Sequence, residues 1–259
     1  MSAISLEFLG TGTSQGVPVI GCKCPVCTSS DVRDQRLRSS ALLRTQSTTV
    51  ALDCGPDFRQ QMLRAGCDRL DAVVLTHEHM DHVSGLDDLR ALQFKQNKPT
   101  TIYCTESVEY RLRQQFAYAF LENPYPGSPR FDVERIAPDR DFLVGGVRWT
   151  PLPVEHGKGE VLGFRVGDVA YVTDASFIPD TTLDKMHGLE VLVLNALRVE
   201  PHYSHFHLAQ AQEMAQQLAA TQSYFTHISH HLGLHAAIDQ DLPSGISLAH
   251  DGLVVSALS

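Results

Sequence analysis

The most constraining feature of this sequence is a compact group of metal-binding residue types, His77-Glu78-His79-Met80-Asp81-His82. It directly follows the apolar run Ala72–Leu75, which predicts a buried strand with the group on the loop at its carboxyl end. With 13 histidines in 259 residues, a chance His-x-His-x-Asp-His arrangement has a probability of roughly 0.002. Imidazole and carboxylate donors suit zinc, manganese or iron, whereas calcium requires more oxygen ligands. The sequence therefore predicts a transition-metal site on this loop.

Three more candidate metal ligands occur further along the chain, and each comes directly after a predicted strand. They are His156, Asp174 and His227. Taken singly, each has an ordinary interpretation as a solvated loop histidine or a turn-forming aspartate. Their shared placement at strand ends, with the first group as context, favours a common metal centre.

Short predicted strands and helices alternate along the chain, with a run of short strands over 142–172. The chain contains no internal repeat, no low-complexity tract and no long Pro/Gly/Ser linker, so we expect one domain over residues 1–259. Two sheets packed face to face with helices outside them accommodate this order of elements. The sequence thus indicates an α/β fold.

The composition limits the classes of molecule that this protein is expected to bind. A net charge of -9 and a pI near 5.8 disfavour nucleic acid, which is held largely by Lys and Arg. The segment Met1–Phe8 lacks the basic and apolar regions of a secretion signal, and no window holds the ~18 apolar residues of a membrane span. We therefore expect a cytoplasmic protein with a small-molecule substrate and no membrane partner, and the sequence is compatible with a homodimer.

Three of the six cysteines lie in the run Cys22-Lys23-Cys24-Pro25-Val26-Cys27. This spacing, in a loop at about residues 20–30, is typical of metal ligation rather than of a disulfide scaffold, although three reduced thiols on a surface loop are the alternative. We expect the scattered Cys54, Cys67 and Cys104 to be buried thiols.

Taken together, these motifs resemble the metallo-β-lactamase superfamily, whose HxHxDH signature, later His, later Asp and last His match this chain in order over nearly its whole length. The resemblance implies an αββα four-layer sandwich with two divalent metal ions (zinc, manganese or iron) between the sheets. A water or hydroxide shared by the two ions would be the nucleophile. The resemblance assigns one ion to His77, His79 and His156, the other to Asp81, His82 and His227, and a bridging role to Asp174.

Asp53, which ends a predicted strand, resembles the superfamily's acidic residue that orients a metal-ligand histidine. A turn or helix cap before Gly55-Pro56 explains this aspartate equally well.

The opening segment Leu9–Pro18, together with the cysteine run, is similar to the PhnP family of phosphodiesterases associated with the carbon-phosphorus lyase pathway. In that family three cysteines and a late histidine hold a structural zinc, a closed tetrahedral site. The matching residues are Cys22, Cys24, Cys27 and His230. The neighbouring His231 is an alternative fourth ligand.

The histidine-rich stretch Pro201–Leu208 precedes a predicted helix and resembles a family stretch whose histidine faces the scissile phosphate. His205 matches that position, where an imidazole protonates the leaving alkoxide or bonds a phosphoryl oxygen, and we expect His205 to assist the leaving group. His202 and His207 depart from the family pattern and leave the assignment open. Arg198 either adds positive charge for a phosphate or forms a surface ion pair. We assign catalytic roles to two residues: His205, and Asp81 of the first histidine-rich group.

The resemblance implies metal-dependent hydrolysis of a cyclic or small alkyl or ribosyl phosphodiester. A thioesterase, a lactonase and an RNase Z-type nuclease are alternatives on the same ligand set, and a non-catalytic metal-binding module is a fourth. The acidic charge and the absence of a long basic arm disfavour the nuclease. A carboxylate-rich donor set disfavours a purely structural module. Loops 121–130 and 155–161 are expected to select the substrate.

Overall fold

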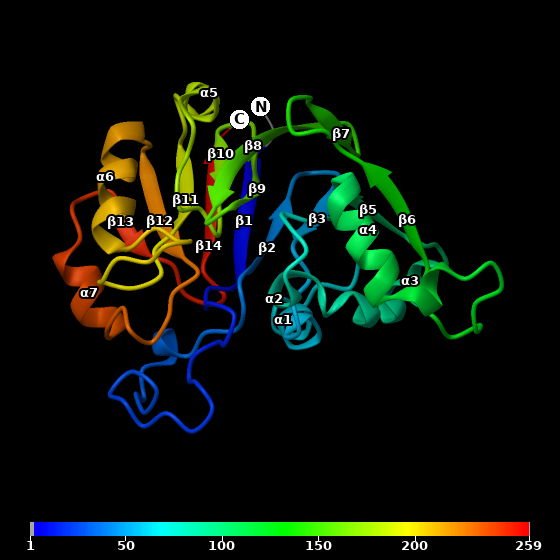
Figure 1. Ribbon diagram of the computed structural model, residues 1–259, viewed down its shortest axis with the longest axis horizontal. Coiled ribbons are helices and arrows are strands. Elements are labelled where there is room, and N and C mark those ends of the chain that lie inside the picture. The colour runs from blue at the N-terminus through cyan, green and yellow to red at the C-terminus, as the bar shows by residue number, and fades with distance from the viewer. Residues whose placement is uncertain (1–2, 259) are drawn as a thin grey trace.

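The computed structural model describes residues 3–258 and shows two mixed β-sheets packed face to face, with helices on the outer face of each (Figure 1). Across the first sheet the strands are β14 (Val254–Leu258), β1 (Ala3–Gly10), β2 (Ser40–Arg44), β3 (Thr49–Leu52), β4 (Ala72–Val74), β5 (Thr100–Cys104) and β6 (Phe131–Arg135). Across the second they are β13 (Ile246–Leu248), β12 (Gln222–Thr226), β11 (Val191–Asn195), β10 (Val169–Tyr171), β9 (Gly159–Val166), β8 (Val147–His156) and β7 (Phe142–Val144).

The helices divide between the two outer faces, which makes the arrangement an αββα sandwich and confirms the predicted fold. Those packed on the first sheet are α1 (Phe58–Arg64), α2 (Met80–Val83), η2 (Leu86–Leu89), α3 (Arg90–Gln96), α4 (Glu106–Gln115) and η3 (Ala117–Phe120). Those packed on the second are α5 (Asp180–Leu183), η4 (Asp184–Met186), α6 (Leu208–Leu218) and α7 (His235–Asp241). The short helix η1 (Val32–Asp34) belongs to the long N-terminal loop. None of the helices within residues 3–258 has the length and hydropathy needed to cross a bilayer.

Strand geometry explains why the central strands read as continuous apolar runs. Side chains alternate between the two faces of a strand, so Leu52 and Val74 enter the core between the sheets. Their neighbours Ala51 and Val73 enter the core under the first layer of helices. Because both faces are covered, these strands are apolar apart from Thr49 at the start of β3.

The sequence patterns missed some elements. The hydrophobic periodicity over 86–94 predicts one helix, but the chain forms η2 and α3 there. The pattern over 181–187 likewise predicts one helix, and the chain forms α5 and η4. Strand β6 was not predicted, because it is an edge strand whose side chains are mostly exposed and so lacks a run of apolar residues. The helix α7 was also missed.

Candidate functional site

The candidate ligands lie together because they follow the ends of strands that share an edge of the sandwich. Strands β3 and β4 are parallel in the first sheet, and β10, β11 and β12 are parallel in the second. Parallel strands end at the same edge of a sheet, so the loops after them converge. The residues delivered this way are Asp53 after β3, the His77–His82 group after β4, Asp174 after β10 and His227 after β12, with His156 at the end of β8.

Two glycines allow the His77–His82 group to pack against the end of β3. A Cβ on Gly55 would lie 2.0 Å from the carbonyl oxygen of Asp81, and one on Gly85 would lie 2.0 Å from the carbonyl oxygen of Gly55. The Cys54 N–H donates to the His82 carbonyl oxygen at 2.7 Å. Any larger residue at either glycine would push the His77–His82 loop away from β3.

Three site residues adopt the left-handed backbone conformation that non-glycine residues rarely adopt: Asp53 (φ 63°), Asp174 (φ 60°) and His227 (φ 54°). Such strain costs about 1–3 kcal/mol per residue and persists where the surroundings enforce it, commonly at functional sites. Asn195 helps to hold the backbone of Asp174 in this conformation, because its side-chain amide bonds the next residue, Ala175. The Ala175 N–H donates to Asn195 Oδ1 at 2.7 Å, and Asn195 Nδ2 donates to the Ala175 carbonyl oxygen at 3.0 Å. The backbone is therefore bent so that these side chains point into the site.

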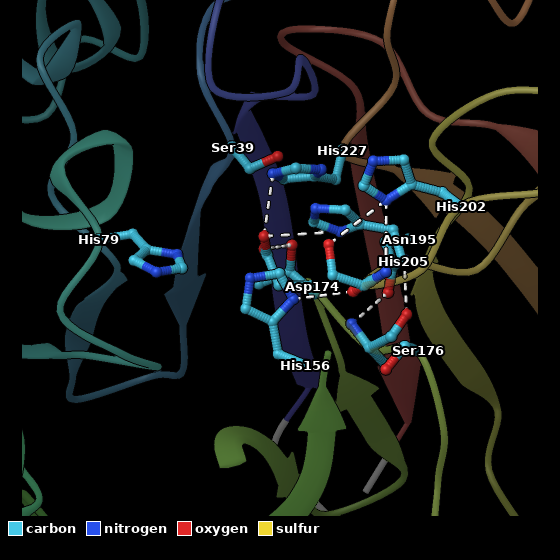
Figure 2. A network of polar contacts seen from close by, with 12 residues as sticks. Ser39, His79, His156, Asp174, Ser176, Asn195, His202, His205 and His227 are labelled. Atoms are coloured by element: carbon cyan, nitrogen blue, oxygen red, sulfur yellow. Dashed lines mark hydrogen bonds and ion pairs between the residues drawn. The ribbon is translucent and has the colours of Figure 1, made fainter. Parts of the chain in front are cut away.

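The donor atoms form overlapping groups in which all atoms lie within 4.8 Å of one another. These groups are His77 with His79 and His156, Asp81 with His82 and His227, His77 with His82 and Asp174, and His156 with Asp174 and His205. Figure 2 shows Asp174, His156, His205 and His227 turned toward one another, with His79 facing them from the other side. Asp174 is central, because its two oxygens lie 3.1 Å from His227 Nε2 and 3.3 Å from His82 Nε2. The structure thus brings all seven predicted ligands together in overlapping groups, two of which are the sets that the family resemblance implies.

The chemistry of this donor set fits divalent cations. His82 Nε2 and both ring nitrogens of His227 are buried and have no hydrogen-bond partner, although His82 Nε2 lies 3.3 Å from carboxylate oxygens of both Asp81 and Asp174. A buried polar atom left unpaired costs about 1–3 kcal/mol. Burial lowers the pKa of His82, but Asp174, Asp53 and Asp81 together raise it well above its usual value. The cluster therefore attracts positive charge and offers it ring nitrogens without hydrogen-bond partners beside carboxylate oxygens.

Asp53 contacts a ligand histidine and does not cap a helix. Its Oδ2 accepts from His82 Nδ1 at 2.7 Å, and its Oδ1 accepts from the Thr76 N–H at 2.8 Å. The Thr76 hydroxyl also reaches His77 Nδ1 at 2.9 Å. Helix α1 is preceded by a different aspartate, Asp57. Of the two interpretations of Asp53, the geometry supports the one in which Asp53 orients a candidate metal-ligand histidine.

Among the three histidines of the loop before α6, His205 lies nearest to the ligand cluster. Its Nδ1 is 3.7 Å from Asp174 Oδ1 and is buried without a hydrogen-bond partner. Burial, aided by the positive field of His227, lowers the pKa of His205 to about 3. The centre of the His202 ring lies 5.3 Å from that of the His205 ring. His207 directly precedes α6, where its main-chain N–H donates to a side-chain oxygen of that helix.

Within residues 3–258, Arg198 forms no surface ion pair, one of the two roles that the sequence left open. Its guanidinium donates to the carbonyl oxygens of Glu200 and Pro201, at 3.1 and 2.7 Å. These bonds fold the start of the histidine-rich loop onto itself. Arg198 is therefore a loop-stabilising residue in this structure.

A second donor cluster lies in the N-terminal loop. The Sγ atoms of Cys22, Cys24 and Cys27 lie 3.4, 3.4 and 3.5 Å from His230 Nδ1. Sulfur and nitrogen ligands at about 2.3 and 2.0–2.1 Å from a tetrahedral zinc are roughly 3.6 Å apart, so the four atoms fit such an ion. The Cys27 N–H, followed by His230, lowers the pKa of Cys24 to about 6, which favours its thiolate. His231 is exposed and packs on the His230 ring from outside, so His230 is the fourth member.

A cavity of about 370 Å³ opens beside the ligand cluster. It is lined by His77, Glu78, His79, His156, Gly157, Lys158, Gly159, Glu160, Val161, Tyr203 and Ser204. The loop after β8 thus reaches the cavity, as expected from the sequence, whereas no residue of loop 121–130 lines it. Sequence reasoning did not single out Glu78, Lys158 or Tyr203, because nothing in their local pattern marks them as cavity residues.

Comparison with known proteins places this chain in a family. Residues 48–228 match the family described as the beta-lactamase superfamily domain. A crystal structure of a diphosphatase from the PhnP family aligns with a TM-score of 0.93 and 41% identity, covering 99% of this chain and 98% of that one. Zinc-bound PqqB from Methylobacterium extorquens shares the fold with a TM-score of 0.76 at 21% identity, covering 97% of this chain and 99% of that one.

One relative carries a different name. The octanoyltransferase of Porphyromonas gingivalis is 40% identical over 248 residues, which are 95% of this chain but only 50% of that protein. The chain therefore spans about half the length of this curated relative, and that activity is a property of a protein twice as long.

Proposed function

We propose that this chain, which belongs to the metallo-β-lactamase superfamily and is a PhnP-like member of it, hydrolyses small phosphodiesters with the help of two divalent metal ions. The observation that carries the proposal is the convergence of seven donor side chains and His205 in one cluster, of which His77, His79 and His156 also line the cavity. The PhnP-family relative that matches the whole chain is a diphosphatase, so phosphoric anhydrides belong to the candidate substrates as well as esters.

The proposed metal ligands follow the two donor sets. His77, His79 and His156 would hold one ion, Asp81, His82 and His227 the other, and Asp174 both. Zinc, manganese and iron all accept such ligands. Bound there, such ions supply Lewis-acid activation of water and neutralise charge on phosphoryl oxygens. In the same way, Cys22, Cys24, Cys27 and His230 are proposed to hold a structural zinc, because four protein ligands leave no place for substrate.

The protein's own groups orient these ligands and the substrate. Asp53 holds His82 with Nε2 facing the cluster, and the Ser204 carbonyl oxygen accepts from His156 Nδ1 at 2.8 Å, which leaves His156 Nε2 free to bind. Because its pKa is lowered to about 3, His205 is a neutral imidazole at pH 7. A neutral imidazole N–H is a hydrogen-bond donor to a phosphoryl oxygen but a poor acid. Of its two roles, we therefore favour binding of the phosphoryl oxygen.

The test is a substrate screen with the purified protein loaded with zinc or manganese. Bis(p-nitrophenyl) phosphate and a dinucleoside diphosphate are compared with a lactone and with an octanoyl thioester, which covers the acyl chemistry in the name of the longer relative. We expect turnover of the phosphoric substrates. Turnover of the thioester or lactone alone would replace the proposal with acyl hydrolysis on the same ligands.

Elemental analysis of the same preparation tests the metal count. We expect two ions per chain in addition to the structural zinc, and Asp174→Ala should lose most of the activity because it contacts both donor sets. A fully active preparation that holds only one metal in total would contradict both the bridging role of Asp174 and the zinc cluster.

A further inference from the structure

An exposed aromatic ring stands at the mouth of the cavity. Tyr203 lines the cavity together with the ligand histidines, yet 84% of its surface is exposed. The next residue, Ser204, is bonded to His156, and a Cβ on Gly157 would lie 3.5 Å from the Tyr203 ring. Tyr203 is thus held beside the reacting centre by its neighbours while most of its ring remains uncovered.

Three charged side chains line the same cavity without partners. Within residues 3–258, Glu78, Glu160 and Lys158 form no ion pair and no side-chain hydrogen bond. A second pocket of about 310 Å³ shares Glu78 and Glu160 in its lining and is also lined by Thr105 and Ser107. The carboxylates of Glu78 and Glu160 and the ammonium group of Lys158 are therefore available to a ligand.

These groups match the parts of a nucleotide. An uncovered aromatic ring stacks on a planar base, an interaction of about 1–3 kcal/mol per base. Carboxylates accept hydrogen bonds from hydroxyl groups, and the sugar of a nucleotide carries such groups. One lysine balances one phosphate charge, while two carboxylates repel a chain of further phosphates. The cavity therefore suits one base, one sugar and one phosphate group better than a nucleic acid strand.

We propose that Tyr203, with Lys158, Glu78 and Glu160, forms a subsite that recognises the nucleoside part of a nucleotidyl phosphodiester. This inference rests on the proposed phosphodiesterase activity and names its substrate class. In it, the base lies on the Tyr203 ring, the sugar hydroxyls face the carboxylates, and the phosphate lies between Lys158 and the ligand cluster.

The test uses two substrates with the same leaving group, thymidine 5′-(p-nitrophenyl) phosphate and methyl p-nitrophenyl phosphate. We expect wild-type protein to prefer the nucleotidyl ester in kcat/KM, and Tyr203→Ala to lower that preference about tenfold, the loss of one base stack. Tyr203→Phe should retain the preference, since the ring is kept. Tyr125→Ala is the matched control, because Tyr125 is 78% exposed and lies outside both cavities.

A binding measurement gives a readout independent of turnover. By calorimetric titration, Tyr203→Ala should bind thymidine 5′-monophosphate about tenfold more weakly than wild type, and Tyr203→Phe should bind it as wild type does. If both esters are hydrolysed but neither the preference nor the affinity changes in Tyr203→Ala, the subsite is wrong and the hydrolase stands. If wild-type protein hydrolyses neither ester, the proposed function itself fails. A preference for single-stranded oligonucleotides over the mononucleotidyl ester would overturn the substrate class.

Discussion

The Asp53 carboxylate accepts a hydrogen bond from His82 Nδ1 at 2.7 Å, and both side chains are completely buried. This bond orients the ring so that Nε2 faces Asp81 and Asp174. Partners of this kind typically contribute 10- to 100-fold to metal affinity. The pair therefore ties the end of β3 to the proposed metal centre and decides between the two interpretations of Asp53 that the sequence left open.

From this pair we predict that Asp53→Ala weakens active-site metal binding about 10- to 100-fold, as measured by competition with a chelator. Asp53→Asn should have a smaller effect, because its amide oxygen still accepts from His82. The control is Asp132→Ala, on the exposed face of edge strand β6. An Asp53→Ala protein that folds and keeps wild-type metal affinity would leave Asp53 with a purely structural role.

For the cysteine cluster we predict that Cys24→Ser lowers zinc content and thermal stability more than it lowers turnover per folded molecule. The reason is that zinc binding to a closed site contributes folding free energy directly. Cys67→Ser is the matched control, because the Cys67 thiol lies outside the cluster and donates to the Arg69 carbonyl oxygen. The zinc cluster would have to be abandoned if Cys24→Ser melted like wild type and kept all its zinc.

For His205 we predict that replacement by alanine lowers kcat about 10²-fold, the size expected for one lost donor to a phosphoryl oxygen. The loss should be similar for p-nitrophenolate and alkoxide leaving groups, since the pKa of about 3 leaves the imidazole neutral at pH 7. Metal content should not change. A loss of about 10²- to 10⁴-fold confined to the alkoxide would instead make His205 a general acid. His202→Ala and His207→Ala are the matched controls on the same loop.

From the buried His235 we predict how the stability of the folded protein depends on pH. Burial, followed by the charge of Arg36, lowers its pKa to about 4, and its Nδ1 lies 3.0 Å from the Arg36 guanidinium, which must donate. The unfolded chain binds a proton at His235 near pH 6.5, the usual pKa of histidine, whereas the folded chain resists it until about pH 4. Stability should therefore fall as the pH falls from about 6.5 to about 4.

The check is the melting temperature of His235→Asn, whose amide oxygen still accepts from Arg36 but does not titrate. Its decrease over that pH range should be smaller than in wild type by a few degrees, because about 1 kcal/mol moves Tm by roughly 2–4 °C in a protein of this size. The exposed His187→Gln serves as control and should follow wild type. Identical pH profiles for wild type and His235→Asn would show that His235 does not resist protonation in the folded state.

The sequence by itself determined which residues could bind metal and which broad fold would hold them. The His77–His82 group and the later His156, Asp174 and His227 follow apolar runs, and such runs form strands whose ends carry the ligands. These are local signals, because a residue's type and its distance from a strand end are both read along the chain. Edge strand β6 was missed for the same reason, since its local pattern is not apolar.

Only the tertiary structure decided between neighbouring candidates. His230 rather than His231 meets the cysteines, Asp53 meets His82, and Tyr203 stands at the cavity. Each of these facts is a distance between segments far apart in the chain, or a side-chain direction set by a backbone bend such as the left-handed conformation of His227. Composition and spacing carry no information about such distances, because packing of the two sheets, not the local sequence, brings the loops together.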